Sequence, residues 1–64
     1  MNQKLKAPDE ILNAALEKEN AAYRFYDNLL NQCDVNFVKD LLLQLKNEEA
    51  KHAKLIKKKL AKLK

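Results

Sequence analysis

Two stretches of the chain carry apolar residues at helical spacing. In the first stretch, residues three and four apart share one face, namely Leu12, Ala15, Glu19, Ala22, Tyr26 and Leu29. The second stretch repeats this spacing with Val38, Leu42, Leu45, Glu49, His52, Ile56, Lys59 and Leu63. Such alternating steps of three and four predict two amphipathic helices.

The boundaries of these helices are marked by residues that begin or interrupt helices. Pro8 is suited to a first helical turn, and Asp9 and Glu10 place negative charge at the positive end of the helix dipole. The pattern lapses at the polar cluster 31–34, where Asp34 is predicted to cap the second helix. We therefore predict one helix over about 8–31, a loop over about 32–34 and a second helix over about 35–63. The expected fold is an all-α, antiparallel helical hairpin that forms a single domain over 1–64.

Three ionisable residues interrupt the apolar stripes. Glu19 lies in the first stripe, and Glu49 and His52 lie three residues apart in the second. In an antiparallel hairpin these three positions lie at neighbouring levels on facing stripes. A buried and unpaired carboxylate is costly, whereas a metal ion compensates its charge. We therefore predict that Glu19, Glu49 and His52 are metal ligands, and that the same residues carry any catalytic activity.

A single hairpin leaves this predicted site incomplete. A 64-residue chain buries only about 60% of its unfolded surface, and one cysteine excludes an intrachain disulfide. Two-fold pairing would complete the core as a four-helix bundle and bring together four carboxylates and two imidazoles. This is the donor set of ferritin-like di-iron bundles. We expect a homodimer or higher homo-oligomer that binds two iron ions per dimer, with manganese as the alternative metal.

Two sequence segments resemble the rubrerythrin and ferritin-like superfamily. In the segment 15–26, Glu19 is followed seven residues later by Tyr26, within a Phe-Tyr pair. The segment 38–53 ends in Glu48-Glu49-Ala50-Lys51-His52-Ala53, a Glu-Glu-x-x-His signature. The resemblance covers roughly residues 11–60 and implies a di-iron carboxylate site that oxidises Fe(II) with dioxygen or peroxide. It also implies that Glu19, Glu49 and His52 are the iron ligands and that Tyr26 lies beside the centre.

The chain is similar in length to half of a rubrerythrin-type domain, and one cysteine cannot form the cysteine-rich iron module of such proteins. This resembles half-length ferritin-like proteins that dimerise to build their site, some of which act inside encapsulin shells. The shell-targeting peptide of those proteins is not visible in the sequence. The alternative function is a structural or interaction hairpin without catalytic activity.

The charge of the chain is concentrated at its end. Residues 1–50 hold six Lys/Arg and nine Asp/Glu, whereas residues 51–64 hold seven Lys and no acid. The tail lacks the arginines and aromatic residues that favour membranes or nucleic acid, so we interpret its lysines as a solvated helix end. The absence of long apolar runs, of a signal-peptide pattern and of paired cysteines favours a cytoplasmic protein.

Overall fold

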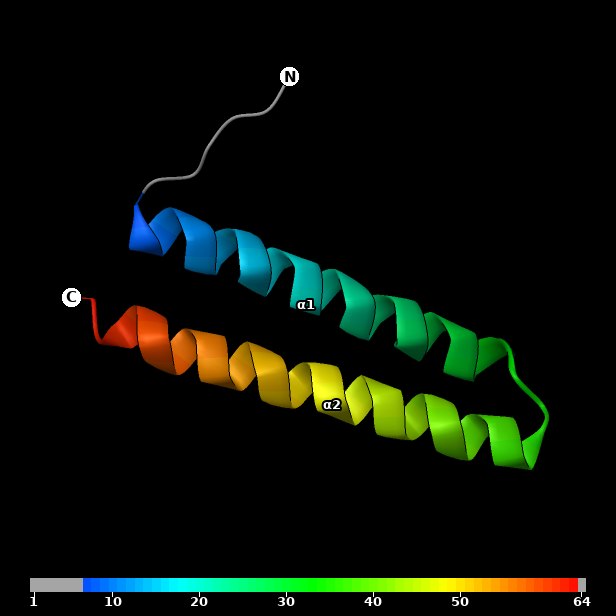
Figure 1. Ribbon diagram of the computed structural model, residues 1–64. Coiled ribbons are helices and arrows are strands. Elements are labelled where there is room, and N and C mark those ends of the chain that lie inside the picture. The colour runs from blue at the N-terminus through cyan, green and yellow to red at the C-terminus, as the bar shows by residue number, and fades with distance from the viewer. Residues whose placement is uncertain (1–6, 64) are drawn as a thin grey trace, which may run out of the picture.

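The protein is a hairpin of two long helices. A computed structural model describes residues 7–63, in which α1 spans Pro8–Gln32 and α2 spans Asn36–Ala61. The helices run antiparallel, so that the start of α1 and the end of α2 lie at the same end of the hairpin (Figure 1). The predicted all-α hairpin is confirmed, and the helix ends lie within two residues of the predicted positions.

The start of α1 follows the sequence prediction. Pro8 occupies the first turn, where its missing N–H removes no helical hydrogen bond. The backbone N–H of Ala7 donates to the Glu10 side chain at 3.3 Å. Asp9 and Glu10 both lie in the first turn, where their negative charges interact favourably with the positive end of the helix dipole.

The predicted cap of the second helix is wrong. The N-cap of α2 is Val35, whose carbonyl accepts hydrogen bonds from the N–H groups of Val38 and Lys39 at 3.1 and 2.9 Å. Asp34 precedes this position by one residue, and no side chain caps the helix. The cause is the extended loop around Cys33, which delays the start of α2 until Asn36.

This uncapped start gives a simple stability prediction. Replacing Val35 with Asp supplies an oxygen for the free N–H groups of the first turn, and we expect the free energy of unfolding to rise by about 0.5–2 kcal/mol. Urea denaturation of Val35→Asp and of the control Val35→Ala would measure the effect. An Asp variant no more stable than the Ala variant would contradict this account of the helix start.

Little of the hairpin is buried. Among residues 7–63, only Leu42 and Ala53 are classed as buried, at 9% and 7% exposure. Within this same range, nine large apolar side chains are exposed, including Phe25, Phe37 and Leu55. Two helices alone therefore form a seam between them but no enclosed core, as the length of the chain leads one to expect.

One polar contact joins the helices on the outer side of this seam. The Lys46 ammonium group lies 3.1 Å from the Asp27 carboxylate and 5.4 Å from the centre of the Tyr23 ring. A partly exposed pair of this kind contributes at most about 1 kcal/mol. The contact helps to set the register of the two helices, and this register determines which side chains meet further along the seam.

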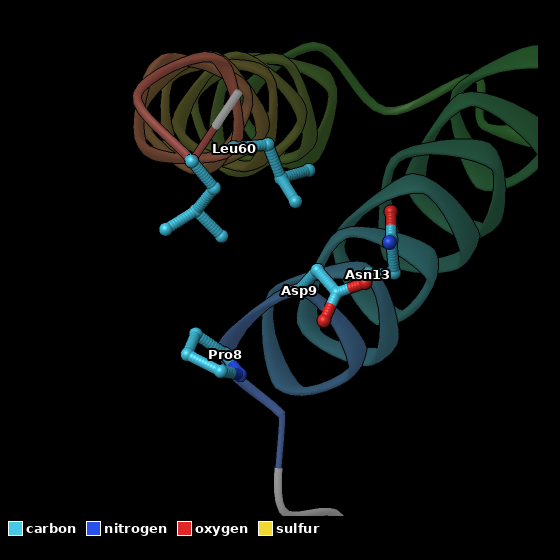
Figure 2. Close-up of a pocket in the computed structure, with 5 residues that line it drawn as sticks. Pro8, Asp9, Asn13 and Leu60 are labelled. Carbon is cyan, nitrogen blue, oxygen red and sulfur yellow. The ribbon is translucent and has the colours of Figure 1, made fainter.

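A separate hollow lies at the open end of the hairpin. It has a volume of about 620 Å³ and lies between the first turns of α1 and the last turns of α2. Figure 2 shows Leu60 of α2 across from Pro8 of α1, with Asp9 and Asn13 on the α1 side. One carboxylate and one amide, without an imidazole or a second acid, make a poor set of metal donors, so this hollow is not the candidate metal centre.

Candidate metal centre

The three ionisable residues of the stripes come together midway along the hairpin. Glu19 is on α1, and Glu49 and His52 are one turn apart on α2, so their side chains point the same way. One potential ligand atom from each residue lies within 4.8 Å of the others. The predicted juxtaposition of Glu19, Glu49 and His52 is thus present in the fold, while their role as ligands stays a prediction.

The imidazole lies against both carboxylates. The Nδ1 atom of His52 is 3.3 Å from Oε1 of Glu19 and 3.6 Å from Oε1 of Glu49. The side chains of Glu19 and Glu49 are about four-fifths buried, whereas that of His52 is 55% exposed. The cluster is therefore covered by its own hairpin on the carboxylate side and open on the histidine side.

The two carboxylates perturb each other. A hydrogen bond between them lowers the pKa of Glu19 and raises the pKa of Glu49, which therefore holds its proton more tightly. Partial desolvation and the charge of Glu19 raise the pKa of Glu49 further. When both carboxylates are ionised, their repulsion destabilises the folded hairpin, and a bound cation would remove this repulsion.

This repulsion predicts that one substitution at the cluster stabilises the metal-free protein. A raised folded-state pKa means that ionised Glu49 weakens folding as the pH rises through that pKa. We therefore expect metal-free Glu49→Gln to be more stable than the unmodified protein near pH 7.5, with a difference that shrinks as acid protonates Glu49. Urea denaturation in the presence of a chelator would measure it.

The neighbouring acid provides the control for this experiment. Glu48 is exposed and takes no part in the cluster, so Glu48→Gln removes the same charge without relieving the pair. Equal effects of the two substitutions would show that net charge, rather than the contact with Glu19, determines stability.

The remaining sequence candidates are placed as follows. The neighbouring acids Glu17 and Glu48 are exposed and lie outside the cluster. Tyr26 is half-buried two turns from Glu19, and its ring contacts Phe25 edge-on at 5.6 Å between centroids. Its placement beside a metal stays a prediction. Cys33 is a free thiol at the end of α1, and its Sγ lies 3.6 Å from the Val35 carbonyl.

Comparison with known proteins agrees with this arrangement. The family model of rubrerythrin matches residues 10–64, which include all of α2, all but the first two residues of α1 and all three clustered residues. The chain belongs to the rubrerythrin family. No match was found among curated proteins or among solved structures.

Membership of the rubrerythrin family indicates a di-iron type of protein, and the donor set fits such ions. Two carboxylates and one imidazole are the donors that first-row divalent metals bind in oxygen- and nitrogen-rich sites. They also match half of the inventory of a di-iron four-helix bundle. Within residues 7–63 of this rubrerythrin-family chain, neither helix is long and apolar enough to span a membrane.

Proposed function

We propose that this rubrerythrin-family protein oxidises Fe(II) with dioxygen or peroxide at a di-iron site formed between two copies of the chain. The observation that carries the proposal is the convergence of Glu19, Glu49 and His52 within 4.8 Å. A hairpin needs no acid or imidazole in its seam in order to fold, and the two carboxylates repel each other when both are ionised. Cation binding explains why they are there.

The two chemical types of ligand have different roles. Glu19 and Glu49 supply negative charge, so that two copies provide four carboxylates for two divalent ions. His52 supplies a neutral nitrogen donor, and its Nδ1 atom is the one that faces both carboxylates. Bound iron would supply the electrons that reduce the oxidant. The protein binds the ions, balances their charge and limits their contact with water.

Pairing of two hairpins is supported by the surface around the cluster. At about 100° per residue, Leu41 and Leu55 lie roughly 80–120° from Glu49 around α2, in the same direction as His52. Phe25 lies roughly 120° from Glu19 around α1. All three side chains are exposed, and they border the side on which His52 is open. A second copy placed on this side would bury these apolar edges and supply the missing ligands.

An aerobic Fe(II) titration tests the proposed function. We expect ferric absorbance to rise until one iron is bound per chain, which corresponds to two per dimer, while the measured mass is that of a dimer or a multiple of it. A purely structural hairpin would show neither iron binding nor oxidation above the rate in buffer. That result would favour the alternative function, a structural or interaction hairpin without catalytic activity.

A further inference from the structure

A groove lies between the two helices, on the edge of the seam where Lys46 contacts Tyr23. Its volume is about 500 Å³. Small side chains of α2, Ala50 and Ala53, border it on one side, and Asn20 and Tyr23 of α1 border it on the other. Glu49 is also among the lining residues, so the same carboxylate takes part in the cluster and in the groove.

The groove does not face the proposed partner. At about 100° per residue, Ala50 and Lys57 lie roughly 80–100° from Glu49 in one direction around α2, and Leu41 and Leu55 lie roughly 80–120° away in the other. A second copy that covers the exposed apolar edges therefore leaves the groove open to water. Pairing closes the histidine side of the cluster and leaves this outer approach.

We propose that the groove is the port through which small anionic or neutral molecules, including the oxidant, reach Glu49 and the metal ions in the assembled protein. This inference rests on the proposed function. Ala50 is decisive because it is exposed and carries only a methyl group at the mouth of the groove. A longer side chain at this position would block the space between the two helices.

Two lysines give the port a charge preference. Lys54 and Lys57 line the groove, and neither forms an ion pair with an acid among residues 7–63. Helical side chains lean toward the N-terminus of their helix, which directs these lysines over the turn that contains Ala50 and Ala53. Their positive charge raises the local concentration of anions.

The port can be tested by following azide binding to the Co(II)-loaded protein. Azide is a small linear anion, and changes in the visible Co(II) bands report its arrival in stopped flow without any oxidation step. In Ala50→Leu we expect azide to bind at least about tenfold more slowly, because a close-packed groove must then open each time an azide ion passes through it. Leucine is a good helix former, so the helix itself should tolerate the change.

Ala21→Leu is the matched control, since Ala21 is an exposed alanine of α1 that does not line the groove. It should bind azide at the unmodified rate. If Ala50→Leu binds Co(II) normally and azide equally fast, the port is refuted. If the unmodified protein binds no Co(II), the proposed metal site fails instead, so the two failures are distinguishable.

The charge preference has its own pair of variants. Lys54→Gln/Lys57→Gln should slow azide association by about tenfold at low salt and weaken its salt dependence, because electrostatic steering is lost. Lys58→Gln/Lys62→Gln removes the same charge from a different part of the helix end, where these lysines line another hollow. Equal slowing in both double variants would show that overall charge acts, and would overturn a specific role for the groove.

Discussion

The His52→Ala protein is expected to lose iron oxidation while keeping its helical hairpin. His52 supplies the only nitrogen donor in the cluster and lies within 3.6 Å of both carboxylates. Changes to residues that merely orient a metal ligand cost about 10–100-fold in affinity or activity, so removal of the ligand itself should cost at least about 100-fold. Initial rates of ferric absorbance after addition of Fe(II), with far-UV circular dichroism as a check on folding, would measure this.

Lys51→Ala is a suitable comparison, because Lys51 is the exposed residue next to His52 on the same helix and takes no part in the cluster. It should oxidise Fe(II) at close to the unmodified rate. Retention of full oxidation by His52→Ala would remove the imidazole from the proposed site. The donor set would then be carboxylate only.

A second large effect, on the association of two copies, is expected from substitutions of the exposed apolar side chains in the proposed pairing surface. Phe25→Lys or Leu41→Lys should convert the dimer into monomers, because each places a charge where an apolar side chain is proposed to be buried. Full burial of such a side chain contributes about 1.5–3 kcal/mol, and a symmetric dimer buries each position twice. The dissociation constant should therefore rise by about 100-fold or more. Sedimentation equilibrium over a range of concentrations would measure the shift.

Leu43→Lys is the matched control for this experiment. Leu43 is 46% exposed, similar to Leu41 at 53%, but it lies on the opposite face of α2. It should leave the dimer intact. Dissociation caused equally by Leu43→Lys and Leu41→Lys would show that the pairing surface is not the face that carries the cluster.

The stripes could be predicted from sequence because burial against one neighbouring helix imposes a strict period. Leu42, which the second stripe contains, is indeed buried, and the interruptions by Glu19, Glu49 and His52 meet as the antiparallel register requires. The rubrerythrin resemblance was confirmed by the family match. Periodicity is informative here because the chain has no glycine and its one proline lies at a helix start.

Local details were less predictable. Asp34 was assigned to the cap because its residue type favours that role, but the three-residue loop lies one position later than predicted, which moves the helix start beyond Asp34. The contact of Lys46 with Asp27 depends on rotamers of long side chains, which spacing alone does not determine. The one sequence signal of the groove is the pair Ala50 and Ala53, since two small residues three apart on a helix leave a depression.

The scarcity of buried side chains has a consequence for how the amount of protein determines its activity. Among residues 7–63 only Leu42 and Ala53 are buried, so in the proposed dimer the hairpin would draw further stability from association, and folding and assembly would both depend on protomer concentration. At low abundance the population of proposed active pairs grows as the square of the number of chains. Doubling synthesis would then quadruple the capacity to oxidise iron, a steep dose response obtained without any regulatory site.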